Sequence, residues 1–404
     1  MISYLEQNNL GKKLVQYKLR DWLFSRQRYW GEPFPIYVEN NQLKAIPYNE
    51  LPVTLPEVAN YEPNEKGEAP LANNKSWVQY KNGHRITDTM PGAAGSSWYF
   101  FRYTDPNNQT EPFSKEKAHY WMPVDLYVGG PEHTVGHLLY SRFWTKVLFD
   151  VGLSPVNEPF KKLAHQGMIL GPDGEKMSKS RGNVIPADDV AKEYGVDTLR
   201  CYVCFLGPLD KDKPWSSQGI DGVKRFLDRF MRLVINDQTL EVNFNNDQPS
   251  ENLIKLLHKS IKKITEDIES LSFNTCISQM MILINEMYKE NCKSSVILKP
   301  LVQLLQPFAP HIAEELWSHL KGDGLVVNAT WPSYDPTKCI DDTVTMGVQV
   351  NGKMRGTIEL PIDADETSAV KLAMSLSTVS AAVGSQPPLK IIYKAGKILN
   401  IIVK

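Results

Sequence analysis

The spacing of apolar residues changes along the chain, and the changes divide it into three parts. Before about residue 217, short apolar runs alternate with turns rich in Gly, Pro, Trp and Tyr. Beyond that point apolar positions recur every three or four residues, the period of amphipathic helices. Near residue 340 the pattern changes to the alternation that is typical of β-strands. We therefore expect domains at 1-217, 218-335 and 341-404.

The middle part predicts an antiparallel helix bundle, because several apolar helical faces are separated by short polar breaks. The helices are expected over residues 219–237, 250–271, 273–291 and 294–321. Pro307 and Pro310 should kink or split the last helix, since proline lacks the amide donor and clashes with the preceding turn.

The last part predicts a small α+β domain. Residues 344–350 alternate between apolar and polar, and Asn351-Gly352 is a strong signal for a tight hairpin turn before a second strand. One helix is expected over 366–383, followed by two further short strands.

The first part contains a strand, a glycine turn and a helix in that order. Residues 126–128 predict a buried strand, Gly129 and Gly130 form the turn, and the helix runs on through Trp144. This α/β arrangement binds nucleotides at the carboxyl end of the strand. Residues 104–116, which precede this strand, are polar and rich in Pro and Asn, so we expect them to form an exposed loop.

Composition narrows the class of protein. The 404 residues are 42% hydrophobic and 23% charged, which is ordinary for a globular protein, and no apolar run approaches the ~20 residues of a membrane span. The formal net charge of −1 means that any nucleic acid must be bound by local basic patches. The N-terminus does not predict a signal peptide, and the five scattered cysteines fit a reducing compartment, so we expect a cytoplasmic protein. Cys201 and Cys204 are expected to pack in a core.

A basic loop is the first candidate for chemistry. Lys176, Ser178, Lys179 and Ser180 follow a Gly- and Pro-rich turn. Lysine provides a mobile positive charge, while hydroxyls and free backbone amides provide short hydrogen bonds, so the loop could hold a polyphosphate. The alternative is a solvated basic loop without a ligand.

Glu132, His133 and His137 form the second candidate. The histidines are four residues apart and share a helical face, but the glutamate precedes the first histidine, so the zinc-protease pattern is not met. No third metal ligand is evident, and we predict no tightly bound metal. The remaining interpretations are a structural histidine pair and a ligand pocket in which Glu132 contacts ribose hydroxyls.

Two further segments combine small or basic residues with aromatic ones. Arg20, Arg26, Arg28 and Trp30 could contact a nucleic-acid backbone and its bases, or form part of a structural segment. Residues 88–100, which include Ser96 and Tyr99, could wall an apolar pocket or pack in the core.

A series of sequence motifs is distributed along the chain. In order they are RDW, SRQRYWGEPFP, DTMP, GSSWYFFRYTDP, VDLYVGGPEHTVGHLLYSRFW, QGMIL, KMSKSRGNV, GVDTLR, FAPHIAEELW and VQVNGKMRG. Together they resemble the class I aminoacyl-tRNA synthetases, and specifically leucyl-tRNA synthetases of the bacterial type. The implied fold is α/β: a partial Rossmann-type nucleotide fold with its KMSKS loop, then an all-α anticodon-binding-type bundle, then a small α+β C-terminal domain that binds tRNA.

The resemblance implies a reaction and a role for each motif. Such enzymes activate leucine with Mg-ATP as leucyl-adenylate and then esterify the 3′ end of tRNA-Leu. Lys176 and Lys179 would be catalytic and Lys179 would also bind ATP, with Ser178 and Ser180 shaping the loop. The other implied ATP contacts are Gly129, Gly130, Glu132, Met168 and Ile169. The leucine pocket would be lined by His133, His137, Ser96 and Tyr99. The tRNA contacts would come from Arg20, Arg26, Arg28, Trp30, Lys353 and Arg355.

The sequence also departs from the family pattern. The His-x-Gly-His signature and the editing domain, both expected before the RDW segment, are absent. We therefore expect the chain to correspond to the C-terminal half of the enzyme, inactive without an N-terminal half or subunit as its partner. Two alternatives stay open: a tRNA-binding module without aminoacylation activity, and a valine- or isoleucine-specific relative.

Overall fold

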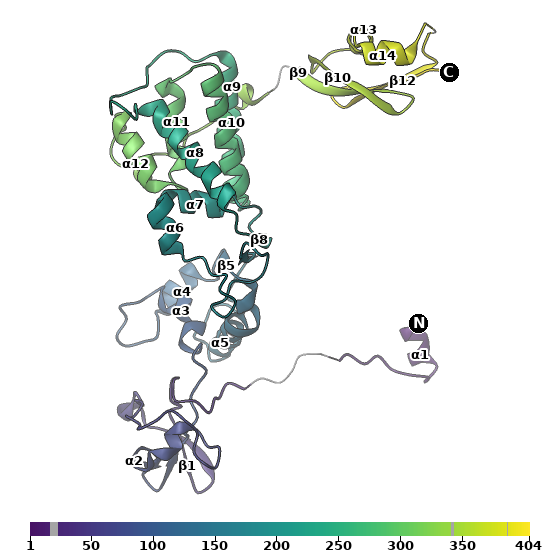
Figure 1. The fold of residues 1–404 in the computed structure, drawn as a ribbon. Coiled ribbons are helices and arrows are strands. Elements are labelled where there is room, and N and C mark those ends of the chain that lie inside the picture. Colours follow the sequence, from purple (N-terminus) through teal and green to yellow (C-terminus); the bar gives the residue numbers. More distant parts are fainter. Residues whose placement is uncertain (17–22, 341–342, 386) are drawn as a thin grey trace. The chain divides into compact units, whose positions relative to one another are not determined.

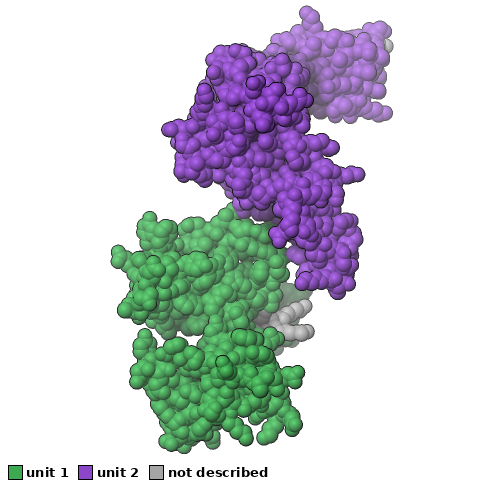
Figure 2. Space-filling view, turned by 60° about the vertical axis from the view of Figure 1, so that its left-hand side comes forward, with its two compact units in different colours: residues 1–166 green, residues 167–404 purple. Residues whose placement is uncertain are grey.

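The structure, a computed structural model, is described in two compact units, Met1–Gln166 and Gly167–Lys404 (Figure 2). The described residues are 1–16, 23–340, 343–385 and 387–404. Within these ranges, no helix is both long enough and apolar enough to cross a membrane. The first unit contains the Gly-Gly turn, and the second contains the lysine loop, the helix bundle and the C-terminal strands.

The first unit contains a four-stranded antiparallel sheet with strand order β2-β1-β4-β3. Figure 1 labels β1 of this sheet and the helix α2 beside it. Its strands are β1 (Ile36–Glu39), β2 (Gln42–Ala45), β3 (Gln79–Tyr80) and β4 (Gly83–Arg85). Asn40 and Asn41 connect β1 to β2 with φ values of 53° and 58°, as a two-residue hairpin turn requires. The unit also contains the short helices α1 (Ile2–Gln7) and α2 (Lys75–Val78).

The predicted strand–turn–helix also lies in the first unit. Strand β5 (Tyr127–Gly129) pairs in parallel with β6 (Leu163–His165), and α5 (Leu139–Asp150) follows the turn. The prediction that the strand is buried is wrong, because the side chain of Val128 is 43% exposed. The physical reason is that, among the described residues, β5 has a neighbouring strand on one side only.

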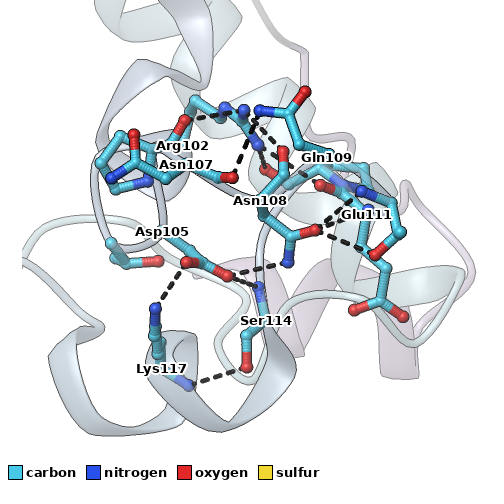
Figure 3. A network of polar contacts seen from close by, with 12 residues as sticks. Arg102, Asp105, Asn107, Asn108, Gln109, Glu111, Ser114 and Lys117 are labelled. Atoms are coloured by element: carbon cyan, nitrogen blue, oxygen red, sulfur yellow. Dashed lines mark hydrogen bonds and ion pairs between the residues drawn. The ribbon is translucent and has the colours of Figure 1, made fainter.

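The helices α3 (Tyr99–Arg102) and α4 (Lys115–Trp121) pack through a small aromatic core around Phe101 and Phe113. The loop between them was expected to be exposed, but Asp105 and Phe113 are buried. Figure 3 shows the reason: the Asp105 carboxylate accepts bonds from Lys117 Nζ at 2.5 Å and from the Ser114 amide at 3.1 Å. The Arg102 guanidinium donates to four loop carbonyls, those of Pro106, Asn108, Glu111 and Pro112.

The second unit begins with a pair of very short parallel strands, β7 (Ile169–Leu170) and β8 (Lys213–Pro214). Helices α6 (Ala187–Tyr194) and α7 (Val196–Phe205) lie between them in sequence. The prediction that Cys201 and Cys204 pack in a core is confirmed, because Cys201 is fully buried and Cys204 packs beside the same cluster. Burial raises the pKa of both thiols.

The helix bundle confirms the predicted periodicity. Its helices are α8 (Ser217–Val234), α9 (Glu251–Glu269), α10 (Phe273–Lys289), α11 (Ser295–Leu305) and α12 (Pro310–His319). Ser216, Ser250 and Ser294 each cap a helix by accepting a backbone amide hydrogen. The predicted last helix is split between Leu305 and Pro310, as the two prolines require.

The C-terminal elements form a mixed sheet with strand order β10-β9-β12-β11, covered by two helices (Figure 1). They are β9 (Thr343–Val350), β10 (Lys353–Pro361), α13 (Glu366–Met374), α14 (Ser377–Val383), β11 (Lys390–Lys394) and β12 (Ile398–Ile402). The predicted hairpin at Asn351-Gly352 is confirmed, with φ values of 50° and 77°. The elements as a whole confirm the expected fold class, whereas the boundaries of the three domains stay a prediction.

The single helix expected over 366–383 is wrong, because the chain leaves the helical conformation at Leu376. Leu376 lies over Gly356 of β10, where an added Cβ would come within 2.9 Å of its Cδ1 atom. The Thr378 hydroxyl also donates to the Arg355 carbonyl at 2.6 Å. The turn therefore packs a half-buried leucine against Gly356 and anchors α14 on the strand.

We predict that Asp105→Ala speeds backbone hydrogen exchange in the loop at 104–114, because Lys117 and the Ser114 amide lose their acceptor. The pKa of Asp105 is held below its ordinary value by Lys117 and Asn108. The stabilisation of the loop by the Asp105 carboxylate is therefore complete above the ordinary aspartate pKa. It is lost as the pH falls through the lowered pKa. Glu111→Ala, which removes an exposed carboxylate of the same loop, is the control. Equal exchange rates in the two variants would contradict the prediction.

Candidate functional site

The end of β5 turns into a helix over a few residues. Gly130 is followed by a 3-10 turn over Pro131–His133, a π-helical turn over Thr134–Leu138, and then α5. A Cβ on Gly130 would lie 2.2 Å from Oε2 of Glu132, so the glutamate folds back over the glycine. At Gly129, in contrast, nothing lies within 4 Å of the position that a Cβ would take. The backbone at Gly129 is therefore open to close approach by a ligand.

A cavity of about 570 Å³ lies beside this turn. It gathers most of the first unit's predicted site residues, namely Ser96, Gly129, Gly130, Glu132, His133 and His137. Tyr99 does not line the cavity, but its hydroxyl donates to the hydroxyl of Tyr127, which does. The sequence predictions missed the remaining lining residues, which are Ala93, Tyr127, Val128, Leu138, Leu163 and Gln166.

A chain of polar contacts crosses the wall of this cavity. The hydroxyl of Tyr127 lies 2.5 Å from Nε2 of His137 and 3.2 Å from the hydroxyl of Tyr99. Burial, and then the nearby His133, lower the pKa of His137, whereas burial raises the pKa of Tyr127. The phenol therefore stays protonated and can donate a hydrogen bond to Nε2 of the neutral imidazole. The ring of Tyr127 stacks on Phe160 at 3.9 Å, which fixes the direction of the hydroxyl.

The other predicted residues of the cavity are less constrained. The Ser96 hydroxyl donates to the carbonyl of Ala93 at 3.1 Å. Nε2 of His133 lies 3.7 Å from Oε1 of Glu132, and both side chains are at least half exposed. In the described part of the chain, no group of three His, Cys, Asp or Glu side chains could hold a metal ion. The cavity is thus an open, mainly neutral pocket with one carboxylate at its rim.

The lysine loop lies in the second unit and forms a series of turns between Gly171 and Asn183. The side chains of Lys176 and Lys179 are exposed, and neither makes a hydrogen bond or ion pair with any described residue. The hydroxyls of Ser178 and Ser180 lie 3.1 Å apart. The loop thus presents two free cations beside two hydroxyls.

Met168 and Ile169 also lie in the second unit, next to β7. The Met168 amide donates to Oδ1 of Asp212 at 2.6 Å, and the Met168 carbonyl accepts from the Lys213 amide at 2.9 Å. Ile169 pairs with Lys213 in the parallel ladder. The backbone of both residues is therefore held in place, and their contact with adenine stays a prediction.

The candidate tRNA contacts differ in their surroundings. Arg20 lies outside the described residues. Arg26 donates to the Tyr140 hydroxyl at 2.9 Å and to the Ser25 carbonyl at 3.0 Å, so its guanidinium contributes to the structure of the first unit. Arg28 is exposed, as are Lys353 and Arg355 on β10, and Trp30 is 69% exposed. These four side chains are open to a partner.

Comparison with known proteins defines the class. The family model of class I tRNA synthetases (I, L, M and V) matches residues 6–216, and that of the anticodon-binding domain of tRNA ligases matches residues 251–371. The chain therefore belongs to the class I tRNA synthetases.

Its relatives narrow the resemblance further. The leucine–tRNA ligase of Bdellovibrio bacteriovorus is 64% identical over 408 residues, which are 100% of this chain and 51% of the relative. That of Chlorobaculum tepidum is 50% identical over 409 residues, covering 100% of this chain and 50% of the relative. A crystal structure of a ternary complex, Agrobacterium radiobacter K84 agnB2 LeuRS-tRNA-LeuAMS, matches with a TM-score of 0.80 at 32% identity, covering 100% of this chain and 55% of that one. The expected resemblance to leucyl-tRNA synthetases is confirmed, and the chain spans about half the length of the curated relatives it matches.

We predict that Tyr127→Phe raises the pKa of His137, because a hydrogen bond donated to Nε2 stabilises the neutral imidazole. An NMR titration of the histidine ring protons measures this change. Tyr103→Phe is the matched control, since Tyr103 is 73% exposed and contacts the same Tyr99 ring. The hydrogen bond would be unimportant if the titration of His137 were the same in both variants.

Proposed function

We propose that this chain is the C-terminal part of a leucine–tRNA ligase, which forms leucyl-adenylate from leucine and ATP and transfers the leucyl group to tRNA-Leu. The observation that carries the proposal is the cavity at the carboxyl end of β5. Six of the residues that the resemblance assigns to ATP or leucine line this one space, namely Ser96, Gly129, Gly130, Glu132, His133 and His137. The leucine–tRNA ligases among the relatives support the choice of amino acid.

The ATP site is proposed at the glycine turn. The open backbone of Gly129 admits a nucleotide without a steric clash, and Gly130 leaves room for Glu132 beside it. Glu132 is exposed, and its carboxylate can accept hydrogen bonds from ribose hydroxyls. Met168 and Ile169 would contact the adenine ring.

The lysine loop would act on the phosphates. When the leucine carboxylate attacks the α-phosphate of ATP, the bond from the α-phosphate to the bridging oxygen breaks and pyrophosphate leaves with added negative charge. Lys176 and Lys179 would stabilise that charge, which is the main catalytic demand of such a transfer. ATP would enter as its Mg²⁺ complex, with the metal held by the phosphates rather than by a protein site.

The leucine site is proposed beside His133 and His137. A neutral His137, held by Tyr127, adds no charge to the cavity wall, which suits an aliphatic side chain. Such a pocket discriminates by shape, and each methylene contributes only ~1–3 kcal/mol. Specificity against isoleucine or valine therefore needs additional selection beyond this wall.

The tRNA is assigned to the other parts of the chain. We propose that the bundle at 218-335 supports the tRNA and that the domain at 341-404 binds it through Lys353 and Arg355, with Arg28 and Trp30 as further contacts. A cytoplasmic location agrees with the five cysteines, all of which are free thiols.

The second candidate is a tRNA-binding module that has no aminoacylation activity. The observation in its favour is that the chain spans about half of its relatives. The unpaired Lys176 and Lys179 and the open cavity favour the enzyme, since neither is needed for binding tRNA alone.

We predict that the isolated chain has no leucine-dependent ATP–pyrophosphate exchange. Exchange should appear when the chain is mixed with the half of the Bdellovibrio relative that it does not cover. In that mixture, Lys176→Ala and Lys179→Ala should each lower kcat about 100-fold, because each removes a charge that acts in the transition state. Lys192→Ala, an exposed lysine on α6, is the control. Full exchange by the isolated chain would refute its dependence on the other half, and equal rates in all variants would refute the catalytic roles of Lys176 and Lys179.

We predict that deletion of 341–404 weakens tRNA-Leu binding and leaves pyrophosphate exchange by the mixture unchanged. The reason is that this part has a hydrophobic core separate from that of the bundle. Filter binding at several salt concentrations measures the first effect. The charge variant Lys353→Glu should weaken binding in the intact chain, with Lys371→Glu on α13 as its control. Unchanged affinity in the deletion and in Lys353→Glu would refute this role.

A further inference from the structure

We propose that Asp173 and Asn183 are positioning residues that hold the lysine loop in the conformation in which Lys176 and Lys179 are presented to phosphates. The inference rests on the proposed function for the identity of the phosphate ligand. It adds to that function a pair of side chains that contact the loop rather than the substrate.

Asn183 connects the two ends of the loop. Its Oδ1 accepts the backbone amide hydrogen of Ser178 at 2.9 Å. Its Nδ2 donates to the carboxylate of Asp173, at 3.2 Å from Oδ1 and 3.1 Å from Oδ2, and lies 3.4 Å from the Lys176 carbonyl oxygen. One amide side chain thus contacts residues on both sides of Met177. Asn183 therefore holds the backbone at Lys176 and at Ser178, the residue directly before Lys179.

Asp173 completes the arrangement from the start of the loop. Its Oδ1 also accepts the Glu175 amide hydrogen at 3.1 Å, which closes a tight turn. A Cβ on Gly171 would lie 2.6 Å from Oδ1 of Asp173 and 2.8 Å from Nδ2 of Asn183. The two side chains therefore pack against the backbone where only glycine fits. These contacts lower the pKa of Asp173, so the carboxylate is charged at neutral pH.

The same contacts keep the lysines unpaired. The acidic side chains within the loop are Asp173 and Glu175, and both are occupied: Asp173 by Asn183, and Glu175 by Arg181 at 3.2 Å. Lys176 and Lys179 consequently have no described carboxylate partner and can neutralise a ligand. A loop without this arrangement would offer its own carboxylates to its lysines.

A reciprocal exchange of the two side chains tests the proposal in the chain as it exists. Asn183→Asp places two carboxylates against each other, so the loop should open. Cleavage by trypsin after Lys176, Lys179 or Arg181 should then become at least about tenfold faster, and the Ser178 amide should exchange faster. The double variant Asp173→Asn with Asn183→Asp restores one donor and one acceptor, and should return both rates close to the original values. Asp189→Asn, in the first turn of α6, is the control.

The same variants are then measured in ATP–pyrophosphate exchange with the complementary half of the Bdellovibrio relative. Asn183→Asp should lower kcat about tenfold without a change in the KM for leucine, and the double variant should recover most of the loss. Unchanged trypsin cleavage in Asn183→Asp, no rescue by the double variant, or an unaffected kcat would each overturn the positioning role. A lack of exchange by the unsubstituted mixture would instead refute the proposed function, whereas the trypsin and amide-exchange rates would still decide whether Asp173 and Asn183 hold the loop.

Discussion

A buried carboxylate, that of Asp197, joins the segment after the lysine loop to the helix bundle. Its side chain is 5% exposed; Oδ1 lies 2.8 Å from Nδ1 of His311, and Oδ2 accepts the Ile312 amide hydrogen at 2.7 Å. That amide belongs to the first turn of α12 and has no partner within its own helix. A negative charge at this position also interacts favourably with the helix dipole. One side chain of α7 therefore satisfies the start of α12, and burial of its own charge is compensated.

Helix α7 is attached to the bundle at the proline-containing break between α11 and α12. Between α11 and α12 the carbonyls of Pro307 and Phe308 are free of helical bonds, and the Arg200 guanidinium donates to both, at 2.9 Å and 3.3 Å. Asp197 and Arg200 are on the same helix, so the break is held on both sides by α7. Because α7 also buries Cys201 in the core of the bundle, the short helices after the lysine loop share their hydrophobic core with α8–α12. The position of the lysine loop thus depends on the bundle.

The parts of the fold that follow local rules could be predicted from the sequence. Helical periodicity correctly predicts the bundle, and Asn351-Gly352 correctly predicts the hairpin, because both signals depend on residues that are close in sequence. The failures depend on partners that are distant in sequence. Leu376 breaks the predicted helix to cover Gly356, and Asp105 is buried through Lys117. In the site, the motif predicts the roles of the glycine turn and the histidines, but it places Tyr127 only in a strand. A tyrosine before a Gly-Gly turn, ten residues from a histidine, was the available signal.

The distribution of packing explains why polar contacts matter at both candidate sites. The bundle has a large continuous core, whereas the cavity lies beside strands of three residues and the lysine loop beside strands of two. Such short strands bury little apolar area and cannot fix a loop by packing alone. At the cavity the Tyr127–His137 contact supplies the missing constraint, and at the loop Asn183 does so. Segments held in this way open locally at a lower free energy than the bundle, because a few hydrogen bonds near water are weaker than a buried core. A bound ligand can therefore shift the conformation of the candidate sites more easily than that of the bundle.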